Sequence, residues 1–297
     1  MQLGKSVTAW YWLVLKIIDR MPRRQKISLL ARLVVKLYAR NARVTHRIGW
    51  AYCSAQDFKQ AEQYLRKSIA LDRRDADAHH NLGVALNGQG KWKEALASFQ
   101  TATTLRPDSS DFWAGLGQCQ KEVGEFSAAR ASLNEALHLN SDNADALLQL
   151  SVVQAELEDW NAALQSSRAY TRLRPDEEFG YWGESAALCE LGRFDEAIEV
   201  AQRNLQINPR SLPTIKGLAW TYQKLGQYPK VIQELKRALE IVSDSAEVRG
   251  WLAWAYVQVN DIDAASEQQK MLAQLDPSLA NELATLIAES RESRNNS

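Results

Sequence analysis

Small and apolar side chains recur along this chain at a constant spacing of 34 residues. Seven consecutive segments, which begin at residues 42, 76, 110, 144, 178, 212 and 246, align without a gap. A fixed period of this length is typical of repeat architectures in which each period is one small unit of secondary structure. The pattern predicts two antiparallel helices in each segment, stacked along the chain as successive hairpins.

Two positions in every segment carry side chains small enough to let helices approach closely. The eighth position is Gly49, Gly83, Gly117, Ser151, Ser185, Ala219 and Ala253 in the seven segments. The twentieth is Ala61, Ala95, Ala129, Ala163, Ala197, Val231 and Ala265. Because two helices come close only where a side chain is nearly absent, we expect these two positions to face each other across each hairpin.

Other positions mark where the two helices end and how the hairpin is filled. The seventeenth position carries Phe58, Trp92, Phe126, Trp160, Phe194, Tyr228 and Ile262, which we expect to fill the wedge beside the small residues. Position 15 carries Gly90, Gly124, Gly192, Gly226 and Asn260, residue types that adopt a left-handed turn at low cost. Position 32 carries Pro107, Pro175, Pro209 and Pro277, which stop the second helix.

These residues resemble the tetratricopeptide-repeat family, whose pattern is W-x2-L-G-x2-Y followed by A-x3-F, A and P. The second segment matches it with Leu82, Gly83, Leu86, Ala95, Phe99, Ala102 and Pro107, and the third adds Trp113. The resemblance implies an all-α, right-handed superhelical α-solenoid of seven 34-residue helix-turn-helix repeats. The repeats span residues 42–279, as 42–75, 76–109, 110–143, 144–177, 178–211, 212–245 and 246–279. Glu184 in place of an apolar residue and Val231 in place of alanine depart from the pattern, so we expect looser packing at that junction.

The repeats are followed by a segment that reads as a capping helix. Leu279, Leu283, Leu286 and Ile287 have helical spacing and would cover the apolar face of the last repeat. Residues 280–297 are therefore assigned to a capping helix and a polar tail.

Residues 1–41 form a basic segment with two interpretations. The segment carries nine Lys or Arg against one acid, whereas the whole chain has 36 of each. Its helical periodicity fits a degenerate repeat that caps the solenoid. Alternatively, Trp10 and Trp12, with the basic row Arg32, Lys36 and Arg40, would bind the cytoplasmic face of an anionic membrane. Nucleic acid is a weaker alternative, because the remaining chain is acidic and repels phosphate.

The sequence predicts no enzyme, no cofactor and no metal. Its three cysteines and four histidines form no cluster with metal-ligand spacing, and no phosphate-binding glycine motif is present. The unpaired cysteines favour a cytoplasmic location. The apolar run at Val7–Ile18 is shorter than the ~20 residues of a membrane span, and no small-residue cleavage pattern follows it.

The family resemblance also implies where a partner polypeptide binds. In such repeats, positions 2, 5, 9, 12 and 13 of the first helices face a concave groove. At those positions the second half of the chain is aromatic, with Phe179, Trp182, Trp220 and Trp254 beside Lys216, Gln223, Lys224 and Gln258. We expect these residues to hold a peptide, because buried Trp side chains dominate many interfaces. The alternative is that the tryptophans pack against neighbouring hairpins.

One class of partner is disfavoured by the first three repeats. Repeats that grip the C-terminal tails of chaperones use Lys, Asn and Arg side chains at defined positions to bind a carboxylate. Here those positions hold His46, Trp50, Asn81, Asp111 and Gly115, and only Asn81 matches. The negative charge of Asp111 would repel a carboxylate. The remaining function hypotheses are a protein-binding scaffold or assembly factor, a soluble adaptor, and a nucleic-acid-linked regulator.

Overall fold

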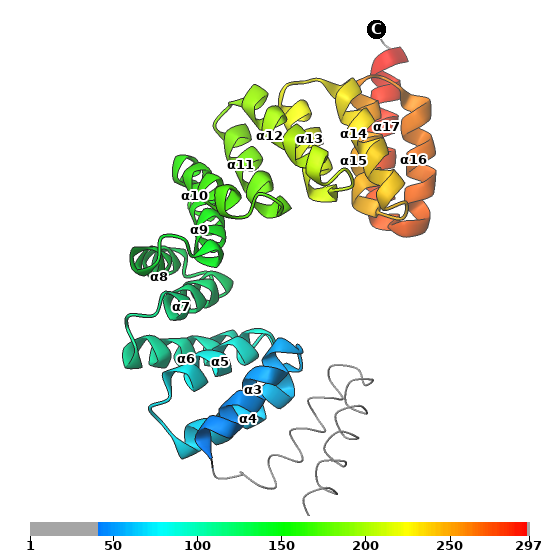
Figure 1. Ribbon diagram of the computed structural model, residues 1–297. Helices are drawn as coiled ribbons and strands as arrows, with labels where there is room; N and C mark the ends of the chain where they lie inside the picture. The colour runs from blue at the N-terminus through cyan, green and yellow to red at the C-terminus, as the bar shows by residue number, and fades with distance from the viewer. Residues whose placement is uncertain (1–40, 296–297) are drawn as a thin grey trace, which may run out of the picture. The chain divides into compact units, whose positions relative to one another are not determined.

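The computed structural model describes residues 41–295, with side chains to Arg291, and in this range α-helices joined by short turns are its only regular secondary structure. The first helices of the hairpins are α3 (Ala42–Ser54), α5 (Ala76–Asn87), α7 (Ser110–Glu122), α9 (Ala144–Glu156), α11 (Glu178–Glu190), α13 (Leu212–Lys224) and α15 (Ala246–Gln258). The second helices are α4 (Phe58–Leu71), α6 (Trp92–Leu105), α8 (Phe126–Leu139), α10 (Trp160–Leu173), α12 (Phe194–Ile207), α14 (Tyr228–Ile241) and α16 (Ile262–Leu275). The final helix is α17 (Pro277–Asn295) (Figure 1). The prediction of an all-α repeat fold with a C-terminal capping helix is confirmed.

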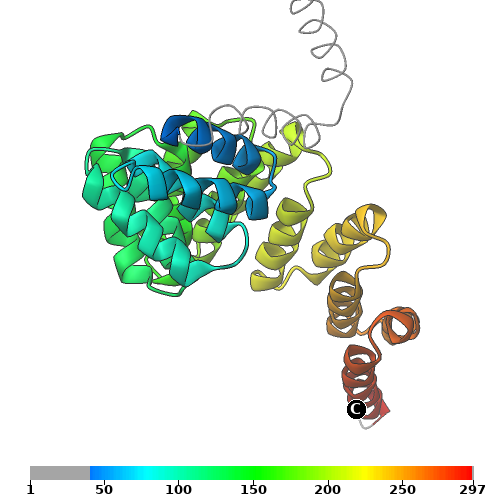
Figure 2. The same ribbon diagram turned by 90° about the horizontal axis from the view of Figure 1, so that it is seen from below.

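The chain divides into two compact units, and the boundary in the sequence falls within α9. Unit 1 ends at Val153 and unit 2 begins at Gln154. In both units, the described helices pack on neighbours that are close in sequence: a helix contacts the one before it, the one after it, or the next but one. Figure 2 shows this order in unit 2, where α13 to α17 follow one another. The hairpins therefore bury their apolar faces on each other rather than in one central core.

Glycine and small residues allow the two helices of a hairpin to touch. A Cβ atom added to Gly83 would lie 2.8 Å from the ring of Phe99, which is fully buried. On the facing helix, Ala95 has no exposed surface. The eighth position is therefore small because the side chain at repeat position 24, on the second helix, packs against it.

The hairpin turns place one residue in the left-handed region. Gly90, Gly124, Gly192, Gly226 and Asn260 have positive φ, and so do Gln56 and Glu158 at the same repeat position. At the end of α3 the amide of Asp57 donates to the carbonyl of Tyr52 at 3.0 Å, and the amide of Gln56 donates to Cys53 at 2.9 Å. These are the two bonds of a Schellman cap, which needs a positive φ but does not require glycine.

The second helices begin on the bulky residue of position 17, from Phe58 to Ile262. Asp57, Asp159 and Asp261 precede three of these helices, and each side chain accepts a hydrogen bond from a backbone amide in the first turn. Such N-caps stabilise a helix start by about 1 kcal/mol each. Turn, cap and ring together fix where each hairpin reverses direction.

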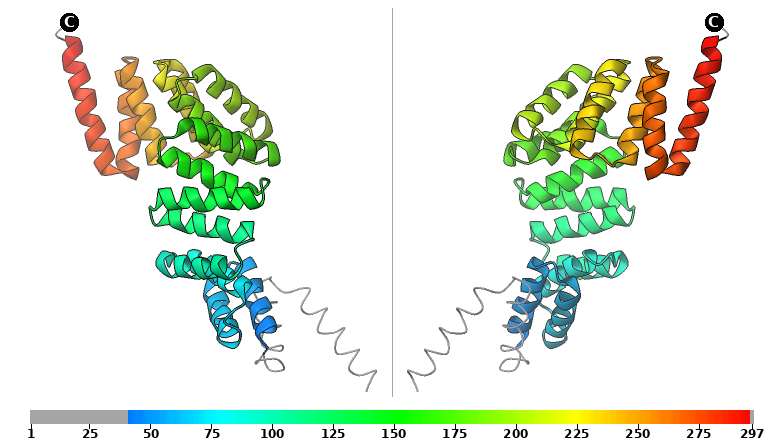
Figure 3. Two further views of the ribbon diagram at one scale, coloured as in Figure 1. Left: turned by 90° about the vertical axis from the view of Figure 1, so that its left-hand side faces the viewer. Right: turned by 90° about the vertical axis from the view of Figure 1, so that its right-hand side faces the viewer.

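The capping helix α17 covers the last hairpin of unit 2. Ala280, Leu283 and Ile287 are buried in a core cluster shared with α13 to α16, and α17 lies beside α16 in both views of Figure 3. The helix continues to Asn295, beyond Arg291, where the sequence pattern had suggested a polar tail.

The two departures from the repeat pattern are both packed. Val231 is fully buried in the core of unit 2. Glu184 on α11 has 7% of its surface exposed, and its carboxylate accepts a hydrogen bond from Nε of Arg168 on α10 at 2.9 Å. An unpaired buried carboxylate is costly, so the arginine is what permits an acid at this position.

Candidate functional site

Three tryptophans surround a hollow on unit 2. Trp182 of α11, Trp220 of α13 and Trp251 of α15 line a space of about 440 Å³ between the first helices of three successive hairpins. Trp182 and Trp220 have 45% and 41% of their surface exposed. The other lining residues are mostly small or apolar: Ser185, Ala186, Cys189, Leu212, Pro213, Thr214, Lys216, Gly217 and Thr221. Large exposed rings around a hollow of this size are typical of a site that receives another molecule.

Gly217 keeps the hollow open at one point of its lining. It is the sixth residue of α13, and a Cβ atom added there would meet no other atom within 4 Å. The φ angle of Gly217 does not lie in the left-handed region, so the backbone does not require glycine there. A glycine inside a helix costs about 1 kcal/mol relative to alanine. Since neither packing nor backbone explains it, the missing side chain leaves space in the hollow.

The polar groups of the hollow are bonded within the protein. The hydroxyl of Thr221 donates to the carbonyl of Gly217 at 2.9 Å, and the hydroxyl of Ser185 donates to Ala197 at 3.1 Å. Burial raises the pKa of the Cys189 thiol, although a hydrogen bond involving Thr221 acts in the opposite direction. The thiol therefore stays protonated near neutral pH and is a poor nucleophile. The surface offers apolar contact rather than reactive groups.

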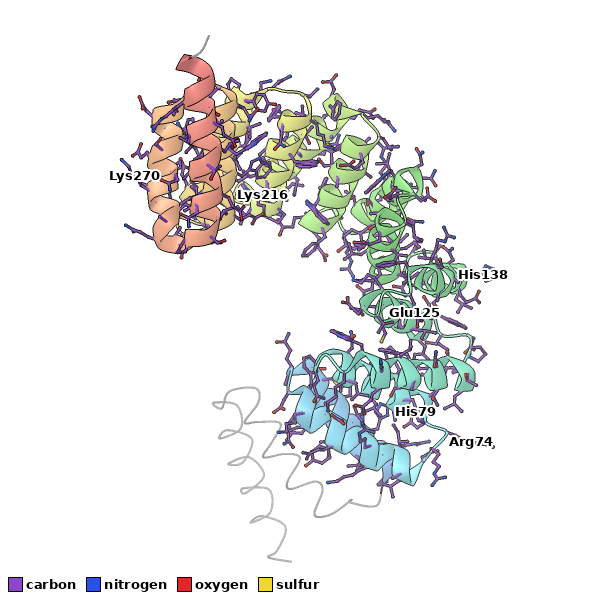
Figure 4. All side chains as sticks on the ribbon, turned by 180° about the vertical axis from the view of Figure 1, so that it is seen from behind. Arg74, His79, Glu125, His138, Lys216 and Lys270 are labelled. Atoms are coloured by element: carbon purple, nitrogen blue, oxygen red, sulfur yellow. The ribbon has the colours of Figure 1, made fainter. Side chains whose placement is uncertain are left out.

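Side chains at the edge of the hollow hold the rings in place. The Nε1 atom of Trp251 donates to Oε1 of Gln223 at 2.7 Å. The ammonium of Lys224 lies 4.7 Å from the centre of the Trp220 ring, within the range of a cation–π contact. Lys216 pairs with Glu247 of α15. Figure 4 shows Lys216 and Lys270, on a first and a second helix respectively, on different sides of unit 2.

The residues expected from the sequence to bind a partner are only partly brought together. Trp182, Trp220 and Lys216 line the hollow, and Gln223 and Lys224 support its rings. Phe179 is exposed in a separate, shallow depression formed with Pro209 and Arg210.

Two other expected residues lie apart from the hollow, and one lining residue was missed. Trp254 is half-buried against the core of unit 2, with its ring 5.7 Å from that of Tyr228, and Gln258 is exposed at the end of α15. Trp251 was not expected at the site, because it occupies the sixth repeat position. The sequence did carry one signal for Trp251: it is a tryptophan at a repeat position that holds glycine in repeats three, five and six.

The residues expected to interact with a membrane lie outside the described part of the chain. They are Trp10, Trp12, Arg32, Lys36 and Arg40. Among residues 41–295, no helix combines the length and the apolar character that a membrane crossing requires. No group of three or more His, Cys, Asp or Glu side chains in this part of the chain is arranged to hold a metal ion.

The single residue that matches a carboxylate clamp is engaged inside unit 1. The side-chain amide of Asn81 lies 2.8 Å from Nε2 of His46, whose Nδ1 atom is 3.3 Å from the carboxylate of Asp75. This chain of contacts joins α3 to α5 and its N-cap. Asn81 is therefore occupied by a structural interaction.

Comparisons with known proteins agree with the repeat architecture. Two family models described as tetratricopeptide repeat match residues 52–119, 86–138 and 116–178. No curated protein matches the sequence. A tetratricopeptide repeat protein from Parabacteroides merdae has a similar structure, with a TM-score of 0.64 and 17% identity over 83% of this chain and 98% of that one.

Two further solved structures share the fold. One is YrrB, described as a TPR protein with an unusual peptide-binding site, with a TM-score of 0.53 and 18% identity over 63% of this chain and 96% of YrrB. The other is the APC/C hetero-tetramer Cut9–Hcn1, with a TM-score of 0.64 and 16% identity over 89% of this chain and 52% of the matched one. At these identities the likeness concerns the fold alone. The family-model matches identify residues 52–178 as tetratricopeptide repeats, and the same 34-residue period and helical hairpins continue to residue 279.

Proposed function

We propose that the chain is a scaffold that binds a partner polypeptide on unit 2, without catalysis. Tetratricopeptide-repeat proteins generally mediate protein–protein interactions, and YrrB is described as having a peptide-binding site. The observation that carries the proposal is the hollow formed by Trp182, Trp220 and Trp251 around Gly217. It offers large apolar surface, and its hydroxyls are already bonded within the protein.

The occupant that fits this hollow is a peptide segment carrying a bulky apolar side chain. Exposed tryptophan surface is unfavourable in water and is covered when such a side chain docks. Interfaces concentrate their binding energy in a few central aromatic residues, each worth about 2 kcal/mol or more when truncated to alanine. Trp182 and Trp220 are candidates for these residues because they are half exposed and line the hollow from two neighbouring first helices, α11 and α13.

The experiment selects peptides from a random display library on the immobilised full chain and measures their affinity by fluorescence polarisation. We expect Trp182→Ala and Trp220→Ala each to weaken a selected peptide by about tenfold or more. The matched control is Trp50→Ala, because Trp50 occupies the same repeat position as Trp220 and is 57% exposed, but lies on α3 of unit 1. Trp254→Ala should mainly reduce stability, since this ring packs on the core.

Two results of this experiment would contradict the proposal of peptide binding. If peptides bind the wild type but Trp182→Ala and Trp220→Ala retain its affinity, the hollow is not the binding surface. If no peptide is selected by a chain whose helical content is intact, the proposal of peptide binding on unit 2 fails.

The role of residues 1–41 is decided by a separate measurement. Sequence alone supports two functions for them: a cap on the solenoid, or an anchor that holds the scaffold at the cytoplasmic face of an anionic membrane. Flotation with vesicles containing phosphatidylserine, with and without residues 1–41, distinguishes the two. Flotation that requires residues 1–41 supports the anchor, and its absence in the full chain favours the cap and a soluble adaptor. Salt-dependent binding to random DNA tests the nucleic-acid alternative.

A further inference from the structure

Unit 1 contains a second hollow, whose chemistry differs from that of the tryptophan hollow. It has a volume of about 490 Å³ and lies between α5, α7 and the first turns of α9. Polar side chains from all three helices line it: His80 and Asn87, Asp111 and Gln118, and Asp145 and Gln149. Two of these are carboxylates, and no lysine or arginine is among the lining residues. The hollow therefore carries negative charge that its own lining does not neutralise.

Buried polar atoms without a hydrogen-bond partner gather at this hollow. Seven buried side-chain atoms in the described residues have no hydrogen-bond partner. Three of the seven belong to lining residues of this one hollow: Nδ1 of His80, Oδ1 of Asn87 and Oε1 of Gln149. A buried polar atom without a partner is rare and costs free energy, so three at one place call for an explanation. A ligand rich in hydrogen-bond donors would supply it.

His80 does not provide the missing positive charge. Its ring stacks on Phe112 at a centroid distance of 4.8 Å and meets the edge of Phe99 at 5.4 Å. Burial lowers the pKa of His80, against the opposing fields of Asp111 and Asp77. The ring is therefore neutral at physiological pH and can accept a hydrogen bond.

Arg106, which lies over the ring of Phe112, is already paired outside the hollow. Arg106 donates to both carboxylate oxygens of Asp77, at 2.9 and 2.6 Å. Asp111 accepts only a long hydrogen bond from the neutral amide of Asn143, at 3.3 Å. The carboxylates that line the hollow thus keep their capacity to bind a cation.

We propose that this hollow binds the guanidinium group of an arginine side chain from a partner polypeptide. A guanidinium has five donors and one positive charge, which matches acceptors spread over three helices and two carboxylates. An ammonium is a compact charge with three donors at one point, and it would leave more of these acceptors without partners. The terminal torsions of Asn87 and Gln149 are soft, so their oxygens can turn toward the bound group.

Other occupants fit this hollow less well. A metal ion is disfavoured because no group of three or more His, Cys, Asp or Glu ligands is arranged around one point in the described residues. An anion is disfavoured by the charge of Asp111 and Asp145. The polypeptide source of the arginine rests on the proposed scaffold function, but the residues that bind it are different.

The experiment uses blocked pentapeptides with one central residue between glycines. The central residue is arginine, lysine or citrulline, and citrulline has the shape of arginine without its charge. Binding to the isotope-labelled full chain is followed by amide chemical shifts, with Gly115 and Gln118 as reporters because both line the hollow. We expect saturable shifts at these reporters with the arginine peptide, weaker binding of the lysine peptide and no binding of the citrulline peptide.

Paired variants test the two carboxylates. Asp111→Asn with Asp145→Asn removes two charges but keeps an oxygen that can accept from Asn143, and we expect the arginine peptide to bind about tenfold more weakly. Asp108→Asn with Asp142→Asn changes the net charge equally, in the turns before α7 and α9, outside the lining. This control should bind within about twofold of the wild type. Thermal melting checks that both variants fold.

Several results would overturn the assignment. The first is that the citrulline peptide binds saturably and as tightly as the arginine peptide. The second is that the Asp111→Asn, Asp145→Asn variant binds the arginine peptide with wild-type affinity. The third is that the wild type shows no saturable shift at millimolar arginine peptide. Tighter binding of lysine would overturn the choice of guanidinium. The citrulline comparison uses the wild-type chain, so it does not depend on any variant folding. Affinities at the tryptophan hollow report separately on the proposed function of unit 2.

Discussion

Replacing Gly217 with alanine should raise stability and weaken binding at the same time. The added methyl group enters a helix whose backbone at this residue suits alanine, and it meets no atom within 4 Å. The stability gain therefore comes from helix propensity and from the less flexible unfolded chain, about 1 kcal/mol. No packing gain is added, because the methyl group lies in the hollow.

The same methyl group occupies space that a ligand would use. It stands among lining residues that include Trp182 and Trp220, and it makes the hollow shallower. Forcing an extra carbon into a filled site costs about 1–3 kcal/mol, so a selected peptide should bind about tenfold more weakly. Urea unfolding followed by circular dichroism gives the stability, and fluorescence polarisation gives the affinity.

Gly83→Ala is the matched control for Gly217→Ala. It makes the same change inside helix α5, but its Cβ atom would lie 2.8 Å from the buried ring of Phe99. We expect it to destabilise unit 1 by about 1–3 kcal/mol. A loss of stability in Gly217→Ala would show that the space is not open. An unchanged affinity would show that the ligand does not use it.

Three further predictions concern buried charges and thiols. Arg168→Met should destabilise unit 2 by about 1–3 kcal/mol in urea unfolding, because it leaves the buried carboxylate of Glu184 without a partner. Adding Glu184→Leu should recover most of the lost stability, and a double variant that stays destabilised would contradict the pairing. Although burial alone would raise the pKa of Glu62, hydrogen bonds led by that from Lys91 hold it at about 2, below its ordinary 4.5. Its contribution to stability is therefore complete above pH 4.5 and is lost as the pH falls toward 2, and Lys91→Met should raise the midpoint measured by carboxyl NMR. Burial raises the pKa of Cys119 to about 11, so iodoacetamide should label it slowly at pH 8 unless the chain is unfolded, and rapid labelling of the native chain would be contrary.

The hairpins could be predicted because each rests on contacts within one repeat. Gly83 is small because the ring of Phe99 packs against it inside a single hairpin, and Gly49 and Gly117 meet a leucine in the same way. The same holds for the turn glycines. The positive φ of Gln56 and Glu158 was not predicted, because glutamine and glutamate are not typical of a left-handed turn. A Schellman cap nevertheless accepts them at this position.

The candidate site was only partly predictable because it forms between repeats. Trp182 and Trp220 could be assigned from repeat position, but Trp251 reaches the hollow only through its placement against the preceding hairpin. The open space at Gly217 depends on how the side chains of neighbouring repeats pack around it, which cannot be predicted from the repeat pattern. Similarly, the acid at Glu184 suggested looser packing because its partner, Arg168, belongs to the preceding repeat, and the repeat pattern does not specify that pair.

The capping helix α17 has a consequence for the rigidity of the tryptophan hollow. In a linear stack of repeats, each hairpin is stabilised by its neighbours, and fraying starts at the outermost one. Because α17 packs on both α15 and α16, the helix that carries Trp251 is an interior layer rather than a terminal one. Deleting α17 would therefore speed amide hydrogen exchange in α15, which carries Trp251. Exchange in α11, which carries Trp182, would stay unchanged.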